Sequence, residues 1–184
     1  MKKFLLIVIV CLINSITLNA QSCEKYYMYG VDFTHTNVYG AEESVEQFKN
    51  AFEGINMLFL TEPQKYDFSK IIDKRVELMI EPISKLNASN DFNGLKTFSS
   101  TYDAPEYSKV IKEYELKETE GVGIVLIAKL LNKTENKGIY ELITFDISTR
   151  EILSTREVSG KARGFGLRNY WAGSIYSIIK SVKL

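Results

Sequence analysis

The sequence predicts an α/β fold of the α+β type: a single mixed β-sheet of about five to six strands, with helices packed on it. Two observations support this prediction. Several short segments alternate apolar and polar residues at period two, as strands do, whereas others repeat apolar residues at spacings of three and four, as amphipathic helices do. Near the C-terminus, strand-like segments precede a helix-like one, which predicts a C-terminal β-meander followed by a terminal helix.

The first third of the chain predicts a strand, a helix and a second strand. Residues 26–33, YYMYGVDF, place their bulky side chains on one face by alternation and predict the first strand. After a loop at 34–40, apolar residues spaced by three and four predict a helix over 41–54, which we expect to end at Gly54. The run INMLFL at 55–60 is continuously apolar and predicts a strand that is buried on both faces.

The middle of the chain carries weaker patterns. Alternation over 76–80 predicts a third strand, which Pro82 would end, and residues 83–86 begin a helical turn. Residues 87–104 are polar, rich in turn-forming residues and without a period, so we expect a long loop there. A proline followed by an apolar stripe predicts a helix over 105–116.

The last third predicts the meander and the terminal helix. GIVLIAKLL at 123–131 is the most apolar run that follows residue 20, and it predicts the central strand. Alternating residues predict two further strands at 139–147 and 151–158, joined by a Ser-Thr-Arg turn. A helix over 171–182 closes the chain, with Trp171 on its apolar side.

The N-terminus predicts export. Residues 1–20 combine a basic start, an uncharged apolar run at 4–13 and a small-residue cleavage site at Ala20, which is typical of a secretory signal peptide. That run is too short for a membrane span, and no later segment approaches the about 20 apolar residues that a span needs, so we expect no transmembrane segment. We therefore predict a single α/β domain over 21–184, in the periplasm or associated with the cell envelope.

Cysteine usage limits the ways in which the exported domain can be stabilised. Cys11 would leave with the signal peptide and only Cys23 would remain, so an internal disulfide is excluded. A lipid anchor on Cys23 is one alternative, but Ala20-Gln21-Ser22 matches a lipobox poorly, and a free thiol after cleavage at Ala20 is favoured. One histidine and one remaining cysteine do not supply the four ligands of a structural zinc site.

Charge argues against one class of partner. Lys and Arg together number 23, as do Asp and Glu, so the net charge is zero and the chain has no basic excess that would indicate nucleic-acid binding. The composition, 45% hydrophobic, is that of a globular domain. We expect no cofactor, because the chain contains neither of the common nucleotide-binding glycine motifs, and no metal, because histidine and cysteine ligands are too few.

The meander carries a resemblance to known families. GIVLIAKLLNK, then YELITFDISTREILS, then a helix resembles the α/β modules in the amino-terminal domain of the Tol translocation propeller protein and in curli-secretion lipoproteins. One strand ends in the pair Phe145-Asp146 and the next begins EIL, with Arg150 in the turn where those families usually have glycine. The resemblance covers about 121–184 and implies a cell-envelope domain. YGVDFT and GFGLRNYWAGS also resemble an uncharacterised family of small exported bacterial proteins.

A glycine-rich segment, GKARGFGLRNYW at 160–171, is the first candidate site. Its backbone lies between a strand and a helix and could direct N–H groups at an anion, with two arginines beside it. The alternative, which we favour because these glycines match no phosphate-binding motif, is a structural turn in which Asn169 caps the last helix while Phe165 and Trp171 pack. The residues that would bind the ligand are Arg163, Gly164, Gly166, Arg168 and Asn169.

The second candidate site surrounds the single histidine. His35 follows the first strand, at the edge where open α/β sheets often bind ligands, and Asp32 lies three residues before it. A Ser-His-acid triad would need His35 as its base and Asp32 to orient it, but the chain has no G-x-S-x-G motif, so we assign no catalytic residue.

The sequence therefore predicts a non-catalytic protein-interaction module of the cell envelope, with an envelope protein of unknown identity as its partner. The alternative is a protein that binds a small molecule or an anion through the loops 34–40 and 160–169. A hydrolase ranks third.

Overall fold

The computed structural model describes residues 24–183. The signal peptide predicted at 1–20, and Cys23 with its alternative lipid anchor, lie outside these residues. The elements follow one another as β1 (Tyr26–Asp32), β2 (Asn37–Tyr39), α1 (Val45–Thr61), α2 (Ser69–Ile72), β3 (Val76–Leu78), α3 (Glu81–Ser89), β4 (Lys96–Thr97), α4 (Tyr107–Lys112), β5 (Val122–Asn132), β6 (Lys137–Asp146), β7 (Ile152–Lys161) and α5 (Leu167–Ser181).

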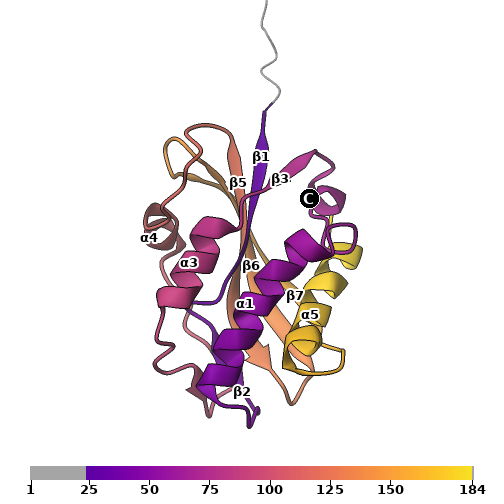
Figure 1. The fold of residues 1–184 in the computed structure, drawn as a ribbon. Coiled ribbons are helices and arrows are strands. Elements are labelled where there is room, and N and C mark those ends of the chain that lie inside the picture. The colour runs from indigo at the N-terminus through magenta and orange to yellow at the C-terminus, as the bar shows by residue number, and fades with distance from the viewer. Residues whose placement is uncertain (1–23, 184) are drawn as a thin grey trace, which may run out of the picture.

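The strands form one mixed sheet around β5, whose residues are all buried. On one side β5 pairs antiparallel with β6, and β7 follows β6 in the same way. On the other side β5 pairs in parallel first with β1 and then with β2, while β3 flanks β1 and β4 flanks β2. The sequence prediction of a mixed sheet, a C-terminal meander and a terminal helix is confirmed (Figure 1).

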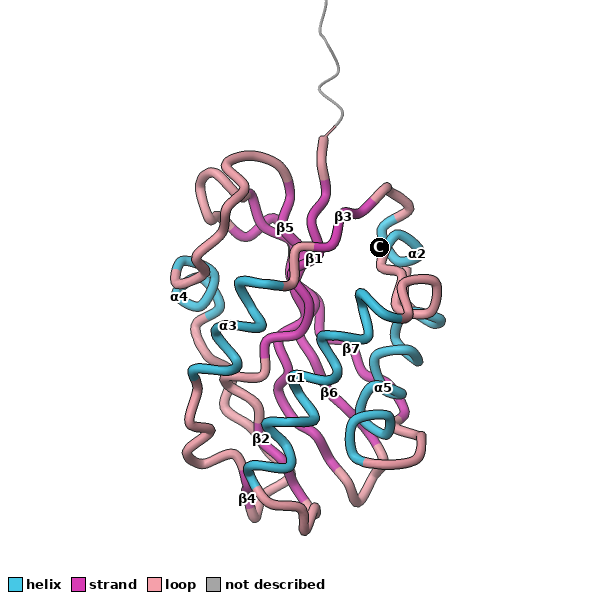
Figure 2. The backbone as a smooth tube through the Cα atoms, viewed as in Figure 1, coloured by secondary structure: helices cyan, strands magenta, loops and turns pink. Residues whose placement is uncertain are grey.

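Helices cover both faces of the sheet because the central strand is apolar on both sides. Ile124 and Leu126 belong to the larger hydrophobic core, which α1 and α5 close. Val125 and Ile127 point the other way, into a second core to which α4 contributes Ile111. Figure 2 shows α1 and α5 in front of the sheet, with α3 beside α1 and α4 farther to the left.

The predicted strand at 55–60 is wrong, because these residues are the last turns of α1. Ile55, Leu58 and Phe59 are buried at helical spacing, whereas Met57 and Leu60 are largely exposed. Apolar residues on the outward side of the helix hide its period in the sequence and produce a continuous run. The helix also passes through Gly54, which does not end it.

Several short elements were also missed. The predicted loop at 34–40 contains β2, and the loop at 87–104 contains β4, which pairs only with β2. The turn at 83–86 is part of α3, and α2 was not predicted. Strands of two or three residues depend on their neighbours in the sheet and leave no readable period in the sequence.

Two buried asparagines complete the edge of β1 beyond the short strand β3. The side chain of Asn56 accepts a hydrogen bond from the Val31 N–H at 2.8 Å and donates to the Val31 carbonyl at 3.0 Å. Asn87 donates to the same carbonyl at 2.8 Å and accepts from the Phe33 N–H at 2.9 Å. The two amides thus take the place of a neighbouring strand and tie α1 and α3 to the sheet.

Replacing Asn56 by alanine should lower the free energy of unfolding by about 1–3 kcal/mol, because the buried Val31 N–H loses its acceptor. Asn50→Ala, at an exposed position of the same helix, is the matched control and should change it by less than about 0.5 kcal/mol. Denaturant titrations of the two variants measure the difference. Equal stabilities would show that the Asn56 amide does not support the sheet edge.

Candidate functional site

Asp32 ends β1 as a buried carboxylate. One of its oxygens accepts hydrogen bonds from the backbone N–H and the hydroxyl of Thr34, at 2.8 and 2.6 Å. The other accepts from the Tyr114 hydroxyl at 2.7 Å. Burial, and then the Asp32 charge, raises the pKa of Tyr114 well above its ordinary value. Asp32 therefore fixes Tyr114 and the start of the loop that follows β1.

His35 lies on the surface, in the turn between β1 and β2. Within residues 24–183 no hydrogen bond or ion pair joins it to Asp32, whose oxygens are engaged by Thr34 and Tyr114. The structure therefore does not bring Asp32 and His35 together as the acid and base of a catalytic pair.

The glycines of the second loop serve the docking of α5. A Cβ atom on Gly160 would lie 1.9 Å from the Ser174 carbonyl oxygen, so α5 approaches β7 more closely than any side chain would allow. Gly164 and Gly166 have φ angles of 139° and 78°, in the region that favours glycine. The helix begins at Leu167, directly after Gly166.

Asn169 does not cap α5, contrary to the prediction for the structural turn, because it already lies inside the helix. Its side-chain oxygen accepts a hydrogen bond from Arg168 at 3.0 Å. Phe165 does not pack either, since it is 95% exposed, whereas Trp171 is fully buried as expected. Arg163 is exposed, and its backbone N–H is already bonded to the Tyr170 carbonyl.

The two predicted loops meet the same turn, which joins β5 to β6. The Lys133 N–H donates to the carbonyl of Tyr39, within the predicted loop 34–40, at 2.9 Å. The Ala162 N–H donates to the Asn136 carbonyl at 2.7 Å, at the start of the second loop. The loops therefore flank one turn at one end of the sheet, with the predicted ligand-binding residues at the surface except for Asp32.

Replacing both Arg163 and Arg168 by glutamine should change stability by no more than about 1 kcal/mol, because exposed charges contribute little. If the loop bound an anion, phosphate would raise the melting temperature of the native protein in a saturable way, and the double variant would lose that rise. We expect native protein and variant to respond equally at equal salt. A clear difference would make the loop 160–169 an anion site.

A groove runs between α3 and residues 113–117, with a volume of about 490 Å3. It is lined by Pro82, Leu86 and Tyr114. The Tyr114 hydroxyl donates a hydrogen bond to Asp32. The sequence prediction treated 113–116 as the end of a helix. In the structure α4 ends at Lys112, and the extended residues that follow form one wall of the groove.

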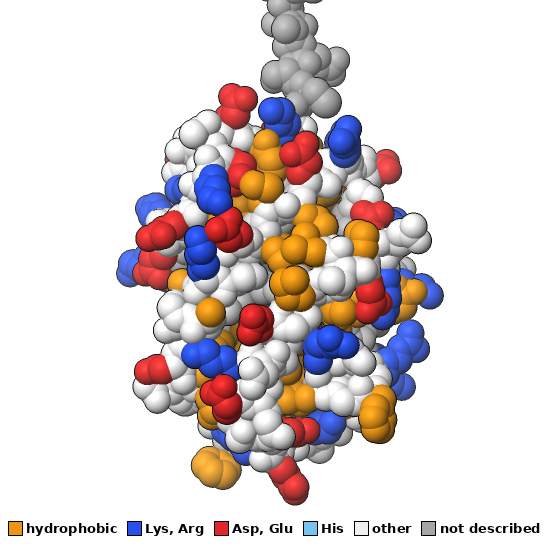
Figure 3. Space-filling view, in the orientation of Figure 1, with side chains coloured by type: hydrophobic (Ala, Val, Ile, Leu, Met, Phe, Trp, Pro, Cys, Tyr) orange, Lys and Arg blue, Asp and Glu red, His pale blue; other side chains and the backbone are white. Residues whose placement is uncertain are grey.

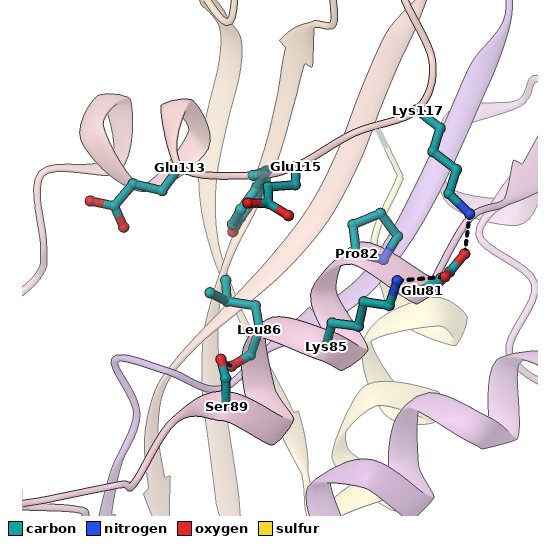
Figure 4. A pocket seen from close by; sticks show the side chains of 9 residues that line it. Glu81, Pro82, Lys85, Leu86, Ser89, Glu113, Glu115 and Lys117 are labelled. Carbon is teal, nitrogen blue, oxygen red and sulfur yellow. Dashed lines mark hydrogen bonds and ion pairs between the residues drawn. The ribbon is translucent and has the colours of Figure 1, made fainter.

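The charges along the groove are separated (Figure 4). At one end the Glu81 carboxylate forms ion pairs with the ammonium groups of Lys85 and Lys117, at N–O distances of 2.8 and 2.5 Å. These two partners, Lys117 first, lower the pKa of Glu81 to about 2. At the other end the carboxylate of Glu115 lies above Leu86, while Glu113, which also lines the groove, turns its carboxylate away from Leu86.

A charged cluster that sequence reasoning missed lies on the α4 side of the sheet, with Lys129 and Glu141 buried and Glu157 at its exposed rim. The Lys129 ammonium is 2.8 Å from both Glu141 and Glu157, which face each other directly across β6 and β7. Glu141 also accepts hydrogen bonds from Thr155 and Tyr107. Burial opposes the charged form of Lys129, but its hydrogen bonds to the two carboxylates outweigh burial and raise its pKa.

The position of Lys129 depends on a β-bulge. Ala128 pairs with Tyr140 and Leu130 with Ile139, so Lys129 is the extra residue of β5. Tyr102, from the segment before α4, covers the cluster with its ring 4.7 Å from the ammonium and donates to Glu157. Every group in the cluster has a partner, so we regard it as a support for the fold and for the 98–106 segment.

The largest gathering of exposed apolar side chains in Figure 3 lies over the C-terminal half of α1 and around β3. Met57 and Leu60 are 45% and 48% exposed. Val76 and Leu78 of β3 are partly buried and, with Pro63, line a cavity of about 280 Å3. We call these five residues the α1–β3 patch. Its signal in the sequence was the apolar run at 55–60.

Two further observations concern membranes and metals. From Glu24 to Lys183, no helix is both long enough and apolar enough to cross a membrane. In this part of the chain no group of three or more His, Cys, Asp and Glu side chains is placed to hold a metal ion.

Comparison with known proteins yields little. No family model matches the sequence, and no curated protein matches it. Among solved structures, the chain is similar to the LpoB C-terminal domain from Salmonella enterica, with 12% sequence identity and a TM-score of 0.32. The similarity covers 78% of this chain and 87% of that domain. It is a weak resemblance of fold and carries no argument about function.

Proposed function

We propose that this chain is an exported cell-envelope domain that acts as a non-catalytic protein-interaction module, and that its partner binds the α1–β3 patch. The patch is the observation that carries the proposal. Soluble monomeric domains seldom expose contiguous apolar patches of more than a few hundred Å2, and the largest patch on a domain is often where a partner, a ligand or a membrane binds. Export is supported by the signal-peptide pattern of residues 1–20.

The patch combines two kinds of contact. Covering Met57 and Leu60 removes apolar area from water, at about 25 cal/mol per Å2, and methionine is enriched in the cores of interfaces. Next to them β3 is an edge strand of the described sheet and pairs only with β1. An edge strand presents backbone N–H and C=O groups to which a partner strand can add. Apolar contact and main-chain hydrogen bonding would then act together.

The patch also matches what a transient interface needs. A standard interface buries about 800 Å2 on each partner, so these five residues would form its apolar centre, with the charged residues around them as the rim.

The loops 34–40 and 160–169 remain the site of the alternative function, binding of an anion or small molecule.

The double variant Met57→Lys, Leu60→Lys tests the proposal. Both side chains are about half exposed, so lysine can direct its head into water, and the fold should persist. We expect tagged native protein to retain envelope proteins that the double variant loses. Leu153→Lys is the matched control, because Leu153 is 56% exposed on β7, at the opposite edge of the sheet. Retention of the same proteins by all three chains would refute this interface.

A further inference from the structure

We propose that the groove between α3 and residues 113–117 binds a basic side chain, lysine or arginine, presented by an extended segment of a partner protein. The site is separate from the α1–β3 patch and uses none of its residues. Its test therefore does not depend on the proposed function.

The floor of the groove suits the aliphatic part of such a side chain. Pro82 and Leu86 line it from α3, and Tyr114 lines it from the opposite wall. The hydrogen bond to Asp32 fixes the Tyr114 ring, so this wall is preformed. Lysine and arginine cover apolar surface with their methylene stems while keeping their charged heads in water.

The two ends of the groove differ in charge. Glu81 carries one negative charge and pairs with both Lys85 and Lys117, so the lysine end keeps one net positive charge, and a basic side chain would bind at the opposite end. Glu115, above Leu86, takes part in no ion pair or side-chain hydrogen bond within residues 24–183. The C-terminal end of α3, at Ser89, adds the negative end of a helix dipole, which also favours a cation.

The length of the groove suits an extended segment. The residues that line it reach from Glu81 to Ser89, the whole of α3, which at 1.5 Å per residue is about 13 Å long. An extended chain advances about 3.3 Å per residue, so about four residues would span the groove. One basic side chain would then reach Glu115, and the flanking backbone would lie along α3.

A titration with defined peptides tests this site. The probes are acetyl-Gly-Gly-Lys-Gly-Gly-amide and the same peptide with norleucine, which keeps the stem and removes the charge, followed by nuclear magnetic resonance of the full domain. We expect the lysine peptide to shift the amide signals of residues 82–89 and 113–117 in a saturable way. Glu115→Gln should weaken its binding by about fivefold, the upper range for an exposed ion pair.

Glu113→Gln is the matched control, because Glu113 lines the same groove two residues away, but its carboxylate is turned away from Leu86. It should leave the affinity for the lysine peptide unchanged. Three results would each overturn the proposal. They are equal affinity of the native protein and Glu115→Gln for the lysine peptide, equal affinity of the native protein for the lysine and norleucine peptides, and signal shifts that lie outside the groove. The Met57→Lys, Leu60→Lys variant should bind the lysine peptide as the native protein does, which separates the two sites.

Discussion

Replacing Lys129 by methionine should lower the free energy of unfolding by about 3–5 kcal/mol, the cost of leaving a buried charge without its partner. Lys129 is 7% exposed and is the cation between Glu141 and Glu157. Without it, two carboxylates face each other directly on neighbouring strands, which is unfavourable. Denaturant titration at neutral pH measures the loss.

The double variant Lys129→Met, Glu141→Leu should regain most of that stability, because replacing a buried ion pair by apolar residues is often neutral.

Lowering the pH should reduce the free energy of unfolding of the native protein more than that of the Lys129→Met variant. The hydrogen bonds from Lys129 and then Tyr102 hold the pKa of Glu157 below its ordinary value of 4.5. Its contribution to stability is therefore present above about pH 4.5 and is lost as the pH falls below that value. A Lys129→Met loss below about 1 kcal/mol would contradict this account.

Trp171→Ala should cost about 3–5 kcal/mol, because the ring is fully buried beneath α5 and its removal leaves a cavity in the larger core. Trp171→Phe should cost less. It keeps an aromatic ring and removes an indole N–H that has no hydrogen-bond partner within the described residues. Thermal and denaturant unfolding of the two variants give the comparison.

Phe165→Ala is the control for Trp171→Ala, since Phe165 lies in the same segment but is 95% exposed. Its stability should stay within about 0.5 kcal/mol of the native value. If Phe165→Ala proved as costly as Trp171→Ala, the placement of the loop 160–169 and of the start of α5 would be wrong.

Long periodic elements could be predicted from the sequence, and short ones could not. In the meander, β5 carries a continuous apolar run and β6 alternates, and the terminal helix has an apolar stripe, so their own residues predict these elements. By contrast β2 and β4 exist through their pairing with strands far along the chain, which leaves no local pattern. The roles of Asn56 and Asn87 could not be predicted from the sequence either, because only the fold brings these side chains to the edge of β1.

The error at 55–60 and the candidate surface have one cause. The sequence predicted a buried strand because the run INMLFL has no polar interruption. In the structure Ile55, Leu58 and Phe59 fill the core, and the apolar residues at 57 and 60 face water. A helix with apolar residues on its exposed side departs from the amphipathic pattern, and such departures concentrate at functional surfaces. The groove and the Lys129 cluster had no signal of this kind.

Site-specific photocrosslinking in intact cells tests the interaction surface most directly. A photoreactive phenylalanine analogue placed at position 57 or at position 60 should give covalent adducts with the same envelope protein, because both positions lie in the α1–β3 patch. The analogue at position 153, which is at least as exposed but lies on the opposite edge of the sheet, should give no such adduct. An absence of adducts at 57 and 60, or the same adduct at 153, would contradict the assignment of the patch as the partner-binding surface.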